Sequence, residues 1–363
     1  FFFIFFLSIF NVQSQNIDAD LVKAKNLYST ENYEQAKILF EKIYTKKKTS
    51  KIYKSYLSCL IKLAEFQSAI KLAKNFYKKN GKNPSILIDL GELYILNGNE
   101  ELGIKEFNNV ISEIQKKPNF ISSAASNFYK KKIYDYALKA YLLAKKNNSN
   151  RNYSFQIANI YSQLGQIENM YKELIEILES SPSYLQTCKV RISRTINDDS
   201  SNNNNILLKK HIIKKIQKED NEALNDLLIW IYLQENDFSS ALERLISLDK
   251  RLEYYDNKIF ELGEISCSNK EFEIAQSAFN YLVKKGERSI YYEESIIQLV
   301  NIKNVKFKEN ITKSEKEIEQ IIKEHEKVIK LLGKTDETIL VLRDLAHIMS
   351  FHKNNKEKAK KIL

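Results

Sequence analysis

The 363-residue chain contains 43% hydrophobic and 28% charged residues, values that are typical of folded proteins and exclude a disordered chain. Only 8 Gly and 3 Pro occur, too few for the frequent turns of a β-sandwich or barrel, so long helices joined by short polar turns are expected. The formal net charge is +11, but the lysines are spread along nearly every expected helix, which favours solvated helix faces over a nucleic-acid site.

The sequence begins with an apolar run, residues 1–10, which is too short to span a membrane. Val12 and Ser14 supply the small residues that a signal peptidase accepts, so residues 1–15 are expected to be a cleavable signal peptide. A buried N-terminal strand or helix is the alternative. No Cys follows the run at a lipoprotein cleavage position. We therefore expect a periplasmic or otherwise exported protein that is not stably inserted in a membrane after cleavage, and a basic leader that precedes Phe1.

Small residues that precede a large apolar residue by four positions recur at a regular interval. They are separated by 33 or 34 residues at positions 36, 69, 103 and 137, and again at 241 and 275; Ala69, which is followed by Ala73, is a weaker case. The clearest pairs are Ala36 with Phe40, Gly103 with Phe107, Ala137 with Tyr141, Ala241 with Leu245 and Ala275 with Phe279. Small residues let two helices approach, and large ones fill the adjacent groove. Because one helix hairpin cannot bury its apolar face alone, stacked hairpins are predicted.

A second marker, a small residue three positions before an aromatic one, lies upstream in several repeats. Examples are Gly91 with Tyr94, Ala125 with Phe128 and Ala158 with Tyr161, while Gly98 and Gly165 fall at the expected turn between two helices. The period and both markers resemble the tetratricopeptide repeat (TPR) family. The resemblance implies an all-α fold, an α-solenoid of antiparallel helix pairs in a right-handed superhelix. With the apolar leader, the layout is similar to exported TPR proteins of flavobacteria-like bacteria of the Bacteroidetes.

The repeats indicate two arrays. Residues 16–182 hold five regular repeats and form an N-terminal array, and residues 183–363 form a divergent C-terminal array. Its first repeat carries an Asn-rich segment, residues 197–205, which is expected to be a polar loop between helices near 184–196 and 206–217. A tolerated surface insertion is the favoured interpretation of this loop, and a binding loop is the alternative. The final residues, EKAKKIL, begin the second helix of another pair, so we expect the chain to continue beyond Leu363.

Candidate catalytic groups do not converge in the sequence. His211, His325, His347 and His352 have no metal-binding pattern around them, and no glycine-rich phosphate-binding motif is present. The three cysteines lie far apart and share no metal-ligand spacing, so they are expected to be small buried residues, although one long-range disulfide remains possible. We therefore expect a protein that is not an enzyme and needs no cofactor or metal.

A concave groove lined by the first helix of each pair is what the family resemblance implies. The positions expected to line it are Lys54, Ser58, Lys62, Glu92, Ser122, Ser126, Tyr129, Lys130, Asn152, Asn159 and Gln163. This lining is polar and mildly basic, which suits an extended acidic or amide-rich peptide. Ser122 and Ser126 stand where two residues of the family's carboxylate clamp are expected, so clamp function is doubtful. A merely solvated polar face is the alternative.

The favoured function is a non-catalytic scaffold of the bacterial envelope that binds a peptide or protein partner in this groove. A glycan or cell-wall binding module is one alternative, and it requires exposed aromatic side chains such as Tyr129 to stack on sugars. An interaction domain of a larger protein, with its chemistry beyond Leu363, is another. The sequence leaves the identity of the partner and the oligomeric state open.

Overall fold

A computed structural model describes residues 17–147 and 153–363 of the chain. These residues form helices joined by turns, with no strand among them, which confirms the prediction of an all-α solenoid built from antiparallel helix pairs. The predicted signal peptide, residues 1–15, lies outside the described residues. The chain divides into two compact units, unit 1 (Phe1–Glu176) and unit 2 (Ile177–Leu363). The predicted division into arrays at residue 182 stays a prediction.

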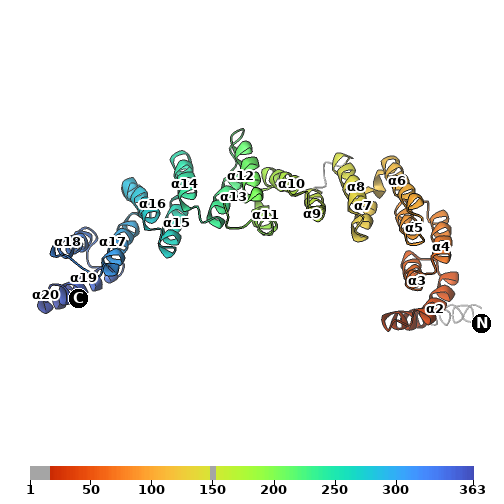
Figure 1. The fold of residues 1–363 in the computed structure, drawn as a ribbon, viewed down its shortest axis with the longest axis horizontal. Helices are drawn as coiled ribbons and strands as arrows, with labels where there is room; N and C mark the ends of the chain where they lie inside the picture. The colour runs from red at the N-terminus through yellow and green to blue at the C-terminus, as the bar shows by residue number, and fades with distance from the viewer. Residues whose placement is uncertain (1–16, 148–152) are drawn as a thin grey trace, which may run out of the picture. The chain divides into compact units, whose positions relative to one another are not determined.

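The first described helix of unit 1 covers residues 17–29, and the helices after it alternate between second and first members of successive pairs (Figure 1). The bounds are α2 (Tyr33–Lys46), α3 (Ser50–Lys62), α4 (Phe66–Lys79), α5 (Ser85–Leu96), α6 (Glu100–Lys116), η1 (Pro118–Phe120), α7 (Ile121–Lys130), α8 (Tyr134–Asn147), α9 (Ser154–Gln163) and α10 (Ile167–Ser180). The boundary with unit 2 falls inside α10. Each helix of α2 to α8 packs against the next one along the chain.

The repeat markers lie in the core, as the spacing predicts. Ala36, Ala69 and Ala137 are completely buried, and the aromatic residues that follow Ala36 and Ala137, Phe40 and Tyr141, are buried beside them. In the third pair, a Cβ atom on Gly103 would lie 2.7 Å from the carbonyl oxygen of Gly91. That distance leaves no room for any side chain, so α5 and α6 approach each other more closely than an alanine would allow.

In most of the helix pairs, the turn between the two helices contains one residue in the left-handed region. Gly98 and Gly165 occupy this position with φ of 83° and 69°, where the sequence predicted a turn. Other pairs place a residue with a side chain there, namely Glu31, Ala64, Lys132, Asn236 and Lys270. Their φ values lie between 55° and 64°. Because the left-handed conformation reverses the chain just after a helix, the same turn recurs with the period of the repeat.

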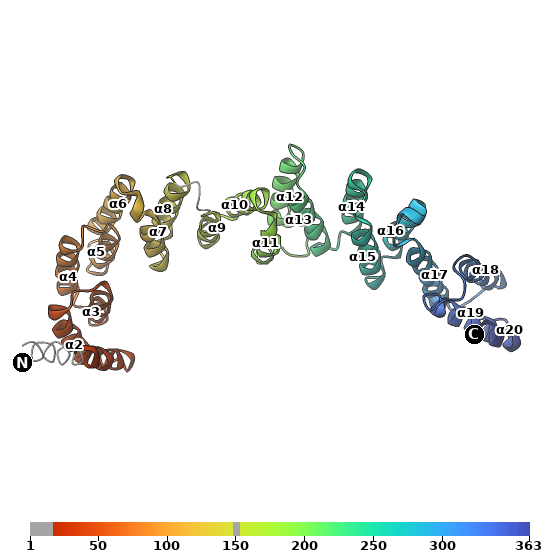
Figure 2. The same ribbon diagram turned by 180° about the vertical axis from the view of Figure 1, so that it is seen from behind.

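Unit 2 continues the alternation of first and second helices, as the second view shows (Figure 2). The bounds are η2 (Pro182–Tyr184), α11 (Leu185–Ile192), α12 (Asn203–Ile216), α13 (Glu222–Gln234), α14 (Phe238–Leu252), α15 (Asp256–Ser268), α16 (Phe272–Lys285), η3 (Gly286–Arg288), α17 (Tyr292–Glu309), α18 (Glu315–Leu332), α19 (Ile339–Phe351) and α20 (Lys356–Ile362). The marker residues Ala241 and Ala275 are completely buried here too, and so is Phe279.

The loop around the Asn-rich segment begins and ends earlier in the chain than the sequence indicates. The predicted loop covered residues 197–205, but α12 already begins at Asn203, and α11 ends at Ile192 rather than near residue 196. The prediction was wrong for residues 203–205 because asparagine also caps helices: the Asn202 side chain accepts a hydrogen bond from the backbone N–H of Asn204 at 2.9 Å.

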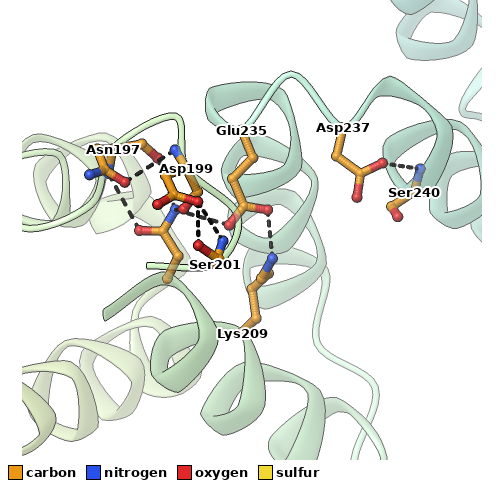
Figure 3. A network of polar contacts seen from close by, with 8 residues as sticks. Asn197, Asp199, Ser201, Lys209, Glu235, Asp237 and Ser240 are labelled. Atoms are coloured by element: carbon orange, nitrogen blue, oxygen red, sulfur yellow. Dashed lines mark hydrogen bonds and ion pairs between the residues drawn. The ribbon is translucent and has the colours of Figure 1, made fainter. Parts of the chain in front are cut away.

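Buried polar contacts hold this loop against the next pair (Figure 3). The Asn205 side chain is completely buried, and its amide nitrogen donates to the carbonyl oxygens of Asn197 at 2.8 Å and Asp199 at 3.2 Å. The same nitrogen donates to Glu235 Oε1 at 3.0 Å, and Lys209 Nζ lies 2.6 Å from Glu235 Oε2. Asn205 of α12 therefore connects the exposed loop to Glu235 at the end of α13.

Candidate protein-binding surface

The residues expected to line the groove lie on α3, α5, α7 and α9, the first helices of four successive pairs in unit 1. Asn152 lies outside the described residues. We call the other ten the first-helix surface: Lys54, Ser58, Lys62, Glu92, Ser122, Ser126, Tyr129, Lys130, Asn159 and Gln163. All ten are exposed or half-buried, so none belongs to the completely buried core.

Lys54 and Ser58 border a cavity of about 320 Å³ between the helix over residues 17–29 and α3. Lys25, Tyr28 and Ser55 also line it, and the Tyr28 hydroxyl forms a 2.6 Å hydrogen bond with Ser58 Oγ. Within the described residues, neither Lys25 nor Lys54 forms an ion pair. Two exposed ammonium groups thus stand at the rim of one hollow.

Glu92 on α5 is not a free groove residue. Its Oε2 atom lies 2.5 Å from Nζ of Lys131, which also lies 3.1 Å from Oδ1 of Asp89. The other oxygen of Asp89 accepts a hydrogen bond from the Tyr53 hydroxyl at 3.1 Å. Burial lowers the pKa of Lys131, but the carboxylates of Asp89 and Glu92 outweigh that effect and the net shift is upward. This cluster joins α3, α5 and the end of α7.

Two more residues of the first-helix surface are engaged by tyrosines. The hydroxyl groups of Ser122 and Tyr153 lie 2.6 Å apart, and the Tyr134 hydroxyl donates to Gln163 Oε1 at 3.3 Å. Such contacts reduce the number of groups that are available to a ligand. They also fix the register between neighbouring pairs, because each joins residues about one repeat apart.

The aromatic and basic residues of the surface differ in exposure. The Tyr129 ring packs edge-on against Tyr134, with the ring centroids 5.7 Å apart, and it is half-buried against the core. The Lys62 ammonium lies 5.8 Å from the Tyr33 ring centroid, while Lys130 is exposed. The glycan interpretation required an openly exposed Tyr129, and this packing removes the observation on which it depended.

Sequence reasoning missed the residues that complete these contacts. Lys25, Tyr28, Asp89 and Lys131 were not among the expected groove positions, although each of them contacts or lies beside a residue that was. A search for polar pairs separated by 30 to 39 residues could have predicted these contacts. Tyr28 with Ser58 and Glu92 with Lys131 are such pairs. Of the charged residues on the first-helix surface, the single acidic one is neutralised by Lys131, so the remaining charges are positive.

In the part of the chain that the structure describes, histidine, cysteine and carboxylate side chains do not gather into a metal site. Within the described ranges, no three or more His, Cys, Asp and Glu residues are grouped so that they could hold a metal ion. No disulfide joins the three cysteines, and burial raises the pKa of the Cys59 and Cys188 thiols to about 11. A thiol with so high a pKa is a poor nucleophile at neutral pH. None of the helices in residues 17–147 and 153–363 combines the length and the apolar character needed to cross a membrane.

Comparison with known proteins identifies no family by sequence: neither a family description nor a curated protein matches the chain. Solved structures that resemble it share 14% identity with it. A chain of the Naa15/Naa10 assembly bound to HypK-THB has a TM-score of 0.31, with 96% of this chain covered and 62% of that one. This chain is thus shorter than that relative.

Two bacterial structures also resemble the chain. The C-terminal part of a TPR repeat-containing protein from Cytophaga hutchinsonii has a TM-score of 0.30 and covers 75% of this chain and 98% of its own. A TPR protein from Parabacteroides merdae has a TM-score of 0.29, with 79% and 98% covered. Likenesses this low establish neither a family nor a function.

Proposed function

We propose that this protein is a non-catalytic repeat scaffold of the TPR type, and that the first-helix surface of unit 1 binds an extended segment of a partner protein. The pair of lysines around the cavity beside α3 carries the proposal. Lys25 and Lys54 are exposed, border the same cavity and form no ion pair within the described residues. Lys37, Lys131 and Lys145 of unit 1 are, in contrast, paired with carboxylates. Lysine side chains held apart from carboxylates by the fold offer sites for the carboxylates of a ligand.

The expected ligand is acidic or rich in side-chain amides. Lys54 and Lys130 lie on α3 and on α7, so a segment that reached both would run across several pairs. An extended peptide fits this requirement because it advances about 3.3 Å per residue and presents a polar backbone along its whole length. Its amide and carboxylate groups would meet Lys54 on α3 and Lys130 on α7, together with Ser126, which also lies on α7.

A binding titration tests the proposal. A fluorescein-labelled twelve-residue peptide of alternating Glu and Asn is titrated with the protein, and its anisotropy is recorded. Double charge reversal, Lys54→Glu with Lys130→Glu, is expected to weaken binding by more than about tenfold, because each lost contact with a charged group is worth about 1.5–3 kcal/mol. Lys71→Glu with Lys105→Glu, at exposed positions of the second helices α4 and α6, changes the net charge by the same amount, serves as the matched control and should leave the affinity unchanged. Equal loss in the control would show that net charge alone governs binding.

We also propose that the protein is exported, on the basis of the apolar residues 1–10 and the small residues that follow them. In cells that express the natural gene, the mature protein should be recovered outside the cytoplasm with an N-terminus at Gln15 or Asn16. N-terminal sequencing of the fractionated protein checks this. A cytoplasmic protein that retains residues 1–15 would contradict export, and it would leave the binding proposal to its own test.

A further inference from the structure

A second cavity, of about 200 Å³, lies in unit 2 among the first helices of three successive pairs, α11, α13 and α15. It is distinct from the first-helix surface, which belongs to unit 1. Trp230, the single tryptophan of the chain, lines this cavity together with residues from the other two helices. We call it the Trp230 cavity.

The walls of the Trp230 cavity are mainly apolar. Ile229 and Leu262 are buried, whereas Trp230 and Leu233 are half-buried and 41% of the Ile265 surface is exposed. Pockets that enclose a drug-sized molecule or a cofactor have volumes of about 300–1,000 Å³. The Trp230 cavity is smaller than that, so its size suits one apolar side chain of a partner protein.

Four charged residues, Lys189, Asp226, Lys258 and Glu261, line this cavity, and they differ in their partners. Glu261 is exposed, so water screens its charge. The Asp226 carboxylate is occupied, since its Oδ1 atom lies 2.6 Å from Nζ of Lys258. Lys189, on α11, forms no ion pair with any carboxylate among the described residues, and its ammonium lies 5.8 Å from the Trp230 ring centroid. Burial lowers the pKa of Lys189, and the Asp226 carboxylate opposes this shift only in part.

A ligand carboxylate would therefore stabilise the Lys189 ammonium. A half-buried ammonium has lost part of its hydration, and an aromatic ring face replaces only part of that stabilisation. A carboxylate at hydrogen-bond distance would supply a charge-assisted contact in surroundings where water screens it little. Aromatic rings such as Trp230 provide large contact areas and are frequent anchors at protein interfaces.

We propose that the Trp230 cavity binds an apolar side chain of a partner protein that has an acidic residue directly beside it, with the apolar group against Trp230 and Leu262 and the carboxylate against Lys189. The proposal concerns a different unit and different residues from the first-helix surface. It stands if that surface binds nothing, and it falls on its own test.

The single tryptophan makes the test direct, because excitation at the red edge of protein absorption reports the environment of Trp230 alone. The full chain is titrated with three acetylated and amidated heptapeptides: Gly-Ser-Glu-Leu-Glu-Ser-Gly, the same peptide with Lys in place of both Glu, and the same peptide with Ser in place of Leu. The first should shift the Trp230 emission saturably. Its Kd should be lower than that of the other two by about tenfold or more, the equivalent of at least one charge-assisted contact.

Variants separate ligand binding from a structural role of Lys189. Lys189→Gln should reduce the preference for the Glu peptide over the Lys peptide to less than about threefold. Lys210→Gln, at an exposed position of α12, should keep the full preference. Lys189→Arg retains the positive charge and should keep the full preference for the Glu peptide over the Lys peptide. This variant tests the role of the charge even if Lys189→Gln proves poorly folded by circular dichroism.

Three results would overturn the proposal. The first is the absence of a saturable change in Trp230 emission with the Glu-Leu-Glu peptide. The second is equal affinity for the Glu and Lys peptides. The third is a Lys189→Gln protein that remains folded and keeps the preference, because Lys189 would then merely join α11 to α13 through the Trp230 ring.

Discussion

The ammonium of Lys131 at the end of α7 lies 3.1 Å from the Asp89 carboxylate of α5, whose side chain is only 11% exposed. Glu92 and the Tyr53 hydroxyl complete the cluster, so one lysine forms ion pairs with two carboxylates of the neighbouring pair. A buried carboxylate that loses its cation keeps its desolvation cost without compensation. The stacking of the third pair on the fourth therefore depends on Lys131 as well as on apolar contacts.

Replacement of Lys131 is the first test of this dependence. Lys131→Met should lower the free energy of unfolding by about 2–4 kcal/mol, because Asp89 is left buried with only the Tyr53 hydroxyl as a partner. Urea denaturation followed by circular dichroism measures the change. Lys130→Met, at the exposed neighbouring position, should lower it by no more than about 0.5 kcal/mol. Similar losses in the two variants would show that the cluster contributes little.

Substitutions at two of the left-handed turn residues are expected to change the free energy of unfolding in opposite directions. Ala64 has φ of 56° and Gly98 has φ of 83°, and no atom would contact a Cβ added to Gly98. Ala64→Gly should raise the free energy of unfolding by up to about 1 kcal/mol, since relief of backbone strain exceeds the extra chain entropy. Gly98→Ala should lower it by about 1–2 kcal/mol. Thermal and urea denaturation check both, and a shift of the same sign in both variants would contradict the shared turn conformation.

The helix pairs and their core could be predicted from the sequence because both depend on local spacing. A small residue and a large one four positions apart on a helix occupy one face, and their recurrence every 34 residues defines the stack. Ala137 with Tyr141 and Ala275 with Phe279 are accordingly buried where expected. These residues act through size and position alone, which a sequence displays directly.

The contacts of Asn205 are expected to restrain the Asn-rich loop of unit 2, although its polar composition is typical of a surface loop. Asn205→Ala removes a completely buried amide that binds Asn197, Asp199 and Glu235, and it should raise the amide hydrogen exchange of residues 197–202 by about tenfold or more. Asn203→Ala changes an exposed side chain on the same turn and should leave the exchange rates unchanged. Unchanged exchange in Asn205→Ala would mean that backbone contacts alone hold the loop.

A pH dependence follows from His325 on α18. Its side chain is 1% exposed, its Nδ1 atom lies 2.8 Å from the Ile321 carbonyl oxygen, and burial lowers its pKa below 6.5. The unfolded state therefore binds a proton more readily than the folded state does. Stability is full above pH 6.5 and falls as the pH drops from 6.5 toward the folded pKa.

The free energy of unfolding, measured at pH 7.0 and at pH 5.5, tests this effect. Both values lie above the pH range in which most carboxylates titrate. His325→Leu should flatten the slope between these values, because it removes the group that protonates on unfolding. His352→Leu, which replaces a histidine less buried than His325, should flatten it less. A slope that survives in His325→Leu would assign the dependence to other groups.

The candidate surface was harder to predict than the fold, because its availability depends on partners far along the chain. Ser58, Glu92 and Ser122 were expected to face a ligand, yet each binds a side chain about one repeat away. Whether such groups meet depends on the rotation and offset between neighbouring pairs, and the period does not specify those quantities. For the same reason, no sequence pattern indicates that Lys131 or Asn205 joins adjacent pairs.

Site-specific photo-crosslinking tests the proposed scaffold function most directly. A benzophenone amino acid replaces Ser55, which lines the cavity beside Lys25 and Lys54, or Lys105 on α6, in cells that produce the natural protein from its own gene. The proposal predicts that position 55 crosslinks one defined protein, that position 105 does not, and that Lys25→Glu with Lys54→Glu abolishes the product at position 55. Identical products at both positions, or a product at position 55 that survives the two charge reversals, would contradict it.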